Sequence, residues 1–229
     1  MKEKTVKAIE ALRFPFFFIV LMWAVHLFKA ATGFRLASLG IFPRDVSGLK
    51  GIITAPLIHG DWQHLISNTV PLAALTAIIF LFYRRVAVKS FLIIYLLTGL
   101  GVWLMARSVY HIGASGIVYG LVSFVFWSGV FRRSFKSIAL ALVILVMYSG
   151  YFLGIVPGEE GISWESHLYG AVAGIIVSWF FKNALEQDEI PRPLLDEEPS
   201  DEFLLPRDAF ERTRSEREQE RSFWRSDRT

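Results

Sequence analysis

The sequence predicts an all-α membrane protein, a polytopic bundle of about six transmembrane helices. Hydrophobic residues make up 53% of the 229 residues, whereas soluble domains contain roughly 45–50%. These residues gather in blocks, and five or six blocks approach or reach the roughly 17–25 apolar residues that a helix needs to cross a bilayer core. Little of the chain is left for another domain.

We expect six spans, at residues 14–31, 62–83, 90–106, 115–131, 137–156 and 166–181. The first resembles a secretory signal peptide, but it is longer than the apolar part of one and more spans follow, so we expect it to be retained. The last is short, and it must lie where the bilayer thins or be shielded by neighbouring helices. The loop of residues 32–61 is apolar and Gly-rich, and we expect it to be partly helical and to lie in the outer membrane interface.

Charge divides the chain into an N-terminus of residues 1–13, a membrane core of residues 14–182 and a tail of residues 183–229. Residues 1–182 contain 16 Lys and Arg against 7 Asp and Glu, and the tail contains 8 Arg against 14 Asp and Glu. The net charge of +3 therefore hides a basic core and an acidic tail, and it gives no reason to expect a nucleic-acid partner. We expect the tail to be a disordered or loosely helical cytoplasmic extension, in which residues 207–224, with alternating Arg and Glu, can form a surface helix.

Basic residues also indicate the orientation of the bundle. The N-terminus and the connections at residues 84–89 and 132–136 each carry several Lys or Arg, and with six spans these segments share one side. Cytoplasmic loops are rich in Lys and Arg, so we expect a multi-pass protein of the cell membrane with both termini in the cytoplasm. The chain has no Cys, which excludes disulfides and thiol catalysis.

Polar residues inside the expected spans mark a candidate functional site, because such residues are costly in lipid. His64 and Asn68 lie at the start of the second span, Ser115 at the start of the fourth and His167 at the start of the sixth. In an alternating bundle, all even-numbered spans begin on the same face of the membrane. Topology alone therefore places the three clusters at one depth.

The residue types indicate nucleophilic catalysis. The hydroxyl of Ser115 is a poor nucleophile unless a base removes its proton, and His167 is a suitable base. Ser115 begins a helix, where free backbone N–H groups and the helix dipole favour negative charge, and Gly113 can shape the turn before it. Because the expected spans contain no Asp or Glu, we expect a dyad and not a triad.

Two further features belong to this hypothesis. His64 and Asn68 are four residues apart on one helix face, so with the Ser115 N–H they can form an oxyanion hole. Tyr119 lies one turn after Ser115, where its ring can support His167. The fourth and sixth spans also carry glycine pairs with GxxxG spacing, which let helix backbones approach closely in lipid; these are Gly116 with Gly120, and Gly170 with Gly174.

These residues together resemble the rhomboid family of intramembrane serine proteases. The matching motifs are Gly-Ala-Ser-Gly around Ser115 with Tyr119 following, HxxGxxxG from His167, and the histidine pair His59 and His64 with Asn68 completing HxxxN. Their order and their positions at the starts of spans two, four and six match as well. The resemblance covers roughly residues 14–182, and it implies a six-span rhomboid-like fold.

The resemblance implies roles for these residues. Ser115 would be the nucleophile and His167 the general base, and the oxyanion donors would be His64, Asn68 and the N–H of Ser115. Substrates would be single-span membrane proteins, cut near the outer membrane boundary, and no cofactor is implied. One departure concerns the first loop, where the family often carries Trp-Arg and this chain has Lys50-Gly51, so the anchoring of the loop is expected to differ.

Other functions fit the sequence less well. The main alternative is a rhomboid-fold protein that binds membrane clients without cutting them. A small transporter would need in-span carboxylates or inverted repeats, and the same lack of carboxylates leaves five His without a convincing metal ligand set. We expect His59 to order the loop, His26 and Lys29 to lie in the interface with the Lys29 stem extended through it, and His111 to have no role.

Overall fold

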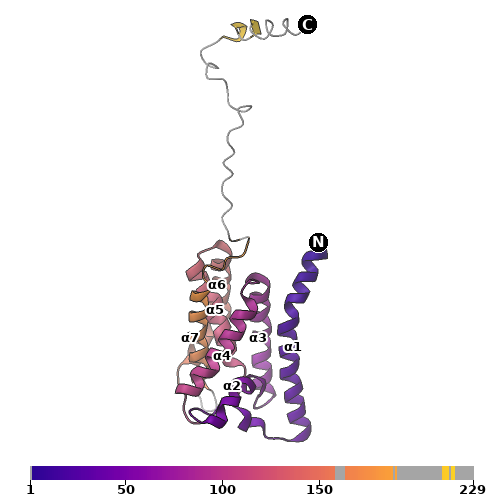
Figure 1. Cartoon of the computed structure of the whole chain (residues 1–229), viewed down its shortest axis with the longest axis vertical. Coiled ribbons are helices and arrows are strands. Elements are labelled where there is room, and N and C mark those ends of the chain that lie inside the picture. Colours follow the sequence, from indigo (N-terminus) through magenta and orange to yellow (C-terminus); the bar gives the residue numbers. More distant parts are fainter. Residues whose placement is uncertain (1, 158–162, 188, 190–212, 217, 220–229) are drawn as a thin grey trace. The chain divides into compact units, whose positions relative to one another are not determined.

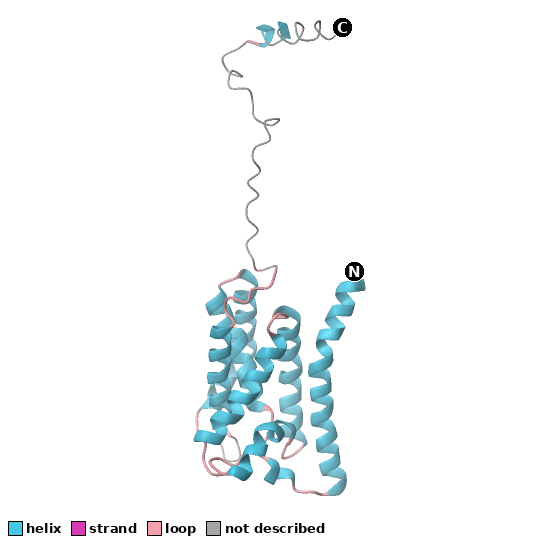
Figure 2. Cartoon of the chain, in the orientation of Figure 1, coloured by secondary structure: helices cyan, strands magenta, loops and turns pink. Residues whose placement is uncertain are grey.

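The computed structural model describes residues 2–157, 163–187, 189, 213–216 and 218–219, and contacts divide the chain into two compact units, Met1–Ile190 and Pro191–Thr229. The first unit is a bundle of helices (Figure 1). In the second unit, Arg214 Nε lies 3.2 Å from Glu218 Oε1. Across the described residues the structure is helix and loop (Figure 2), apart from one isolated β-bridge between Ile41 and His111.

The helices are α1 (Lys2–Thr32), α2 (Gly51–Thr54), α3 (Trp62–Phe82), α4 (Ala87–Met105), α5 (Ser115–Arg132), α6 (Phe135–Met147) and α7 (Trp164–Phe180). Four of them, α1, α3, α4 and α5, are long and apolar enough to cross a membrane. Helix α6 forms a fifth candidate if it is joined to the 3-10 helix η4 (Ser149–Ile155). Helix α7 has 17 residues, and it runs alongside the longer helices (Figure 1).

Two of the expected spans differ from the helices observed. Helix α1 already begins at Lys2, so the apolar block continues a longer helix. The expected fifth span, 137–156, is broken: α6 ends at Met147, and η4 bends away by 66°. The bend turns the carbonyl group of Gly154, in η4, toward α7.

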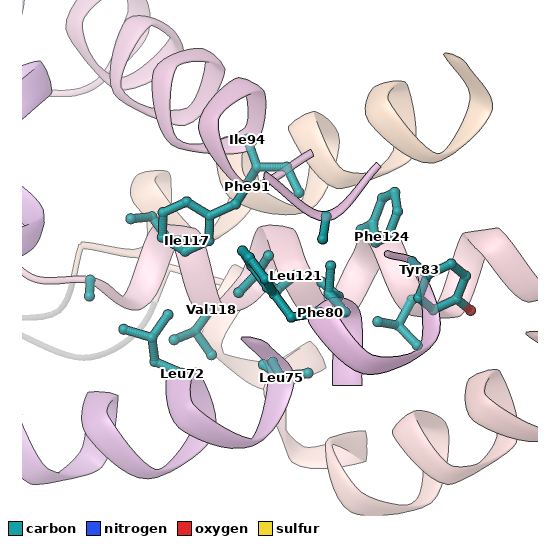
Figure 3. Packing of buried hydrophobic residues seen from close by; sticks show 14 of the residues in the cluster. Leu72, Leu75, Phe80, Tyr83, Phe91, Ile94, Ile117, Val118, Leu121 and Phe124 are labelled. Atoms are coloured by element: carbon teal, nitrogen blue, oxygen red, sulfur yellow. The ribbon is translucent and has the colours of Figure 1, made fainter. Parts of the chain in front are cut away.

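Helix α5 is the centre of the bundle. Its apolar window is 67% buried, against 17–39% for the other three candidate spans. Side chains from α3 and α4 interdigitate with it in the main core (Figure 3); those labelled include Leu72, Leu75, Phe80, Phe91, Ile94, Ile117, Leu121 and Phe124. Around α5, the core begins at Ala114 and continues through the first half of the helix, so it holds the end of the helix that begins with Ser115.

The long first loop is built from short helical turns, which are η1 (Leu36–Leu39), η2 (Val46–Lys50), α2 and η3 (Ala55–Leu57). It is fastened to the end of α4 by Arg44, whose guanidinium donates to the carbonyl of Ala106 at 2.7 Å and to Ser108 Oγ at 2.8 Å. The indole N–H of Trp103 donates back to the carbonyl of Asp45 at 2.8 Å.

The start of the tail differs from the expectation of a disordered or loosely helical extension. Glu189 is buried, and its carboxylate lies 3.0 Å from the Arg132 guanidinium at the last residue of α5. The hydroxyl groups of Ser134 and Ser137 donate to the other carboxylate oxygen at 2.7 and 2.6 Å. Arg132 also lies 4.8 Å above the ring of Tyr83, so the cluster joins α3, α5, α6 and the tail.

This cluster gives a prediction about stability. Glu189→Gln keeps the shape of the side chain but leaves the buried Arg132 without a counter-charge, which should cost about 3–5 kcal/mol of unfolding free energy. Thermal unfolding in detergent micelles measures the change. The control is Glu218→Gln, in an exposed pair, which should have no measurable effect. Equal melting temperatures for both variants would contradict the prediction.

The same carboxylate predicts a pH dependence. Burial alone would raise the pKa of Glu189, but hydrogen bonds from the Glu186 backbone, Ser137 and Ser134, with the charge of Arg132, lower it from 4.5 to about 2. A depressed pKa stabilises the folded state above the unfolded pKa, and this contribution is lost as the pH falls from about 4.5 toward about 2. The difference in melting temperature between wild type and Glu189→Gln should therefore shrink from pH ~7 to pH ~3. A difference in melting temperature that stays the same across this pH range would contradict the prediction.

Candidate active site

Ser115 and His167 meet at one end of the bundle. The Oγ of Ser115 lies 2.9 Å from Nε2 of His167, within hydrogen-bond distance. Ser115 is the first residue of α5, and His167 lies in the first turn of α7. The two side chains are 52 residues apart in the sequence, and the packing of α5 against α7 brings them together.

The second nitrogen of His167 is held by the backbone. Nδ1 lies 2.8 Å from the carbonyl oxygen of Gly154, and a carbonyl only accepts, so Nδ1 carries the proton. Nε2 is then free to accept the proton of Ser115. The ring of Tyr119 stacks on the imidazole at 4.0 Å with an angle of 7° between the planes, and Tyr151 covers Tyr119 at 4.8 Å.

Gly154 is a site residue that the sequence analysis missed. Its carbonyl orients the imidazole as the acid of a catalytic triad would, without placing a carboxylate in the membrane. It must also be small, because a Cβ at this position would lie 1.9 Å from the Tyr119 hydroxyl. No pattern in the sequence indicates this role, because the contact is made by a main-chain carbonyl and the fifth span was expected to be unbroken.

Glycines bring α5 and α7 into direct backbone contact. A Cβ at Gly170 would lie 2.0 Å from the carbonyl oxygen of Gly116, and a Cβ at Gly174 would lie 2.2 Å from that of Gly120. No residue with a side chain fits at Gly170 or Gly174 while this contact is kept. The separation of the two helices, and with it the distance from Ser115 to the imidazole, is therefore set by the absence of side chains.

His64 and Asn68 lie in the first two turns of α3, which is capped by Asp61: its carboxylate accepts from the His64 N–H at 2.8 Å. The His64 ring lies against Gly113, where a Cβ would be 2.6 Å from Nε2. Gly113 also has a φ of +103°, which favours glycine. Asn68 Nδ2 donates to the His64 carbonyl at 2.7 Å, which leaves the second N–H of the amide.

His59 lies beside this pair but does not reach the cavity lining described below. It is buried, and its ring meets the His64 ring edge to face at 5.0 Å. Burial is the main cause that lowers the pKa of His59 to about 3, so the ring is neutral at neutral pH and packs as an uncharged group.

His111 joins the loop before α5 to the start of α7, although no role was expected for it from the sequence. His111 Nδ1 lies 2.6 Å from Ser163 Oγ, and its Nε2 lies 3.0 Å from the carbonyl of Arg107. Ser163 is the N-cap of α7. Arg107 Nε also pairs with Glu165 at 3.1 Å, so the turn that carries the candidate base is fixed by two contacts.

The candidate dyad lies in the wall of a cavity of about 960 Å³, which we call the chamber. Its walls include Ser115 and His167 together with His64, Asn68 and Tyr119. The cavity is large enough for water and for a short stretch of peptide, and polar side chains from α3, α5 and α7 line it together. The three clusters of polar residues therefore share one chamber. Among the described residues, no group of three His, Asp or Glu is placed to hold a metal ion.

In the first loop, Lys50 and Gly51 occupy the positions at which the rhomboid family often has Trp-Arg. A Cβ at Gly51 would lie 2.2 Å from the backbone nitrogen of Ile41, so the loop packs on itself through this glycine. A Cβ at Gly48 would likewise lie 2.1 Å from the carbonyl of Phe42. Backbone packing, with the bonds of Arg44 to the end of α4, anchors the loop in this chain.

Comparison with known proteins shows the family of the chain. Residues 47–184 match the family model of the Rhomboid domain. Uncharacterized proteins of Mycobacterium bovis and Mycobacterium tuberculosis are 39% identical over 171 residues, which is 71% of this chain and 71% of theirs. One of Mycobacterium leprae is 32% identical over 71% of this chain and 68% of its own. The chain belongs to the rhomboid family, and it is a multi-pass integral membrane protein.

The glycine contact gives a prediction. Gly170→Ala would normally favour a helix by roughly 1 kcal/mol, but here its Cβ would collide with the carbonyl of Gly116 and cost about 1–3 kcal/mol. Thermal unfolding should therefore show a lower melting temperature. The control is Gly150→Ala, where a Cβ meets nothing within 4 Å, and it should not be destabilised. A Gly170→Ala protein as stable as wild type would show that α5 and α7 are not in backbone contact.

Proposed function

We propose that this chain is an intramembrane serine endopeptidase that cleaves transmembrane protein substrates with a dyad of Ser115 and His167. The observation that carries the proposal is the 2.9 Å contact between Ser115 Oγ and His167 Nε2, with Nδ1 bound to the Gly154 carbonyl. That tautomer leaves Nε2 as the acceptor for the serine proton. Membership of the rhomboid family supports the same reaction.

The first half of the reaction is acylation. Ser115 Oγ attacks the carbonyl carbon of the substrate peptide bond, and its proton passes to His167 Nε2. The negative charge forms on the substrate oxygen, beside the N–H of Ser115, which as the first residue of α5 has no acceptor within the helix. His64 and Asn68 supply the other donors, and losing one such donor costs on the order of 10²–10³ in rate. His167 then returns the proton to the amine of the leaving peptide, so the C–N bond breaks, an ester of Ser115 remains and acylation is complete.

The second half is hydrolysis. A water in the cavity loses a proton to His167 as its oxygen attacks the ester carbon. His167 then gives this proton to Ser115 Oγ, so the ester C–O bond breaks, the carboxylic acid product leaves and the serine hydroxyl is restored. The polar lining of the cavity keeps this water available at a depth where lipid would exclude it. Stacked Tyr119 holds the imidazole plane through both steps.

The position of the site supports a proposal for substrate and location. The chamber lies at the end of the bundle where α3, α5 and α7 begin, and the bias of Lys and Arg toward the opposite end favours the outer side of the membrane for it. Substrates are then single-span membrane proteins cut near the outer face of the cell membrane, and both termini of the enzyme lie in the cytoplasm.

The test is cleavage of a single-span substrate in proteoliposomes. Ser115→Ala should lower the rate by roughly 10⁴-fold or more, because the nucleophile is lost. A fluorophosphonate probe should label the wild type but not this variant. The control is Ser178→Ala in α7, where the hydroxyl bonds only to its own helix at Ile175, and it should cleave normally.

The same experiment separates the proposed protease from the alternative, a rhomboid-fold protein that binds membrane clients without cutting them. A non-proteolytic protein that binds membrane clients would give no probe labelling at Ser115 and no difference in cleavage between wild type and Ser115→Ala. Either result would overturn the proposed dyad.

A further inference from the structure

Lys29 contacts the segment just before α3. Its ammonium group, near the end of α1, donates to the carbonyl oxygen of His59 at 2.8 Å and also to that of Gly60. From the sequence, this side chain is expected to extend through the interface toward water. Instead, the charged group ends on two main-chain carbonyls of the protein, five and four residues before His64.

One peptide unit links Lys29 to the His64 ring. The carbonyl of the His59–Gly60 peptide accepts from the Lys29 ammonium, and the N–H of the same peptide donates to His64 Nδ1 at 3.4 Å. A cation on the carbonyl withdraws electron density from the amide, and hydrogen bonds in such a chain strengthen one another. The contact with Lys29 therefore makes the Gly60 N–H both better placed and a better donor.

This chain of contacts fixes the tautomer of His64. A neutral imidazole has one nitrogen that accepts and one that donates. Because Nδ1 accepts from Gly60, the proton is on Nε2, and Nε2 is the nitrogen beside Gly113 in the turn before Ser115. Only this tautomer presents a donor toward the chamber. With the proton on Nδ1, Nε2 would present its lone pair to the chamber, and this lone pair would repel an oxyanion.

Other contacts make α1 a rigid base for Lys29. The indole N–H of Trp23 donates to Thr69 Oγ1 at 3.1 Å, and the buried His26 ring lies 4.5 Å from the Trp62 ring. These residues occupy successive turns of α1 on the side that faces the start of α3. The lysine is therefore held in register with the His59–Gly60 peptide.

We propose that Lys29 is a positioning residue for the oxyanion donor His64, and that it acts through the His59–Gly60 peptide, which keeps the His64 proton on Nε2. The inference rests on the proposed function for its effect on rate, but the tautomer of His64 can be measured without any activity.

The experiment compares wild type with Lys29→Met, which keeps an unbranched stem and removes the charge and the donors. Nitrogen NMR of 15N-histidine protein in liposomes, with the His64 signals assigned from His64→Ala, reports the tautomer. We expect wild type to show the proton on Nε2 and Lys29→Met to show a mixture. Turnover should fall about tenfold with KM unchanged, less than the ~10²–10³ loss for deleting the donor itself.

Two further variants make the result specific. Lys29→Arg keeps a charged donor and should restore both the tautomer and most of the turnover. Lys50→Met removes an exposed charge from the first loop and should change neither. Melting temperatures are recorded for all variants, so that a loss of turnover from unfolding is recognised.

The outcomes are distinguishable. Unchanged His64 signals in Lys29→Met would overturn the proposal, and so would a loss of turnover that follows the melting temperature and is not restored by Lys29→Arg. If wild-type cleavage does not depend on Ser115, the proposed function fails instead. In that case the comparison of His64 tautomers still decides whether Lys29 positions this ring.

Discussion

The backbone contact between α5 and α7 is the constraint on which the site depends. Gly170 and Gly174 let α7 lie against the carbonyls of Gly116 and Gly120, and this spacing lets a serine on one helix reach an imidazole on the other. In a membrane, helices gain little from hydrophobic association, so close van der Waals packing must fix their separation. The same glycines therefore provide both the stability of the helix pair and its chemistry.

Main-chain groups orient both histidines of the chamber. The Gly154 carbonyl accepts a hydrogen bond from His167 Nδ1, which keeps the His167 proton there. The Gly60 N–H donates to His64 Nδ1, which leaves the His64 proton on Nε2. The two rings thus have opposite tautomers, one suited to accept a proton and the other to donate a hydrogen bond. A carboxylate would orient a histidine as well, but an ionised group costs more at this depth than a peptide unit whose dipole is already part of the fold.

Helix α5 is fastened at both ends. Ser115, its first residue, faces the chamber, and Arg132, its last, forms the buried pair with Glu189 roughly 26 Å away along the helix axis. The pair joins the chain that follows α7 to the helices that carry the site. Its hydrogen bonds from Ser134 and Ser137 leave the carboxylate satisfied, which is what makes a buried ion pair tolerable.

The sequence by itself determined the helical membrane class, the rhomboid resemblance and the residues that meet at the chamber. Long apolar blocks, and polar residues that recur at the starts of alternate spans, are properties of the chain that need no coordinates. It did not reveal Gly154, Lys29 or Glu189, because their roles come from carbonyls, a main-chain N–H and a pairing across 57 residues. Only the tertiary structure decides such contacts, since every residue has the same peptide group and packing alone selects which one meets a partner.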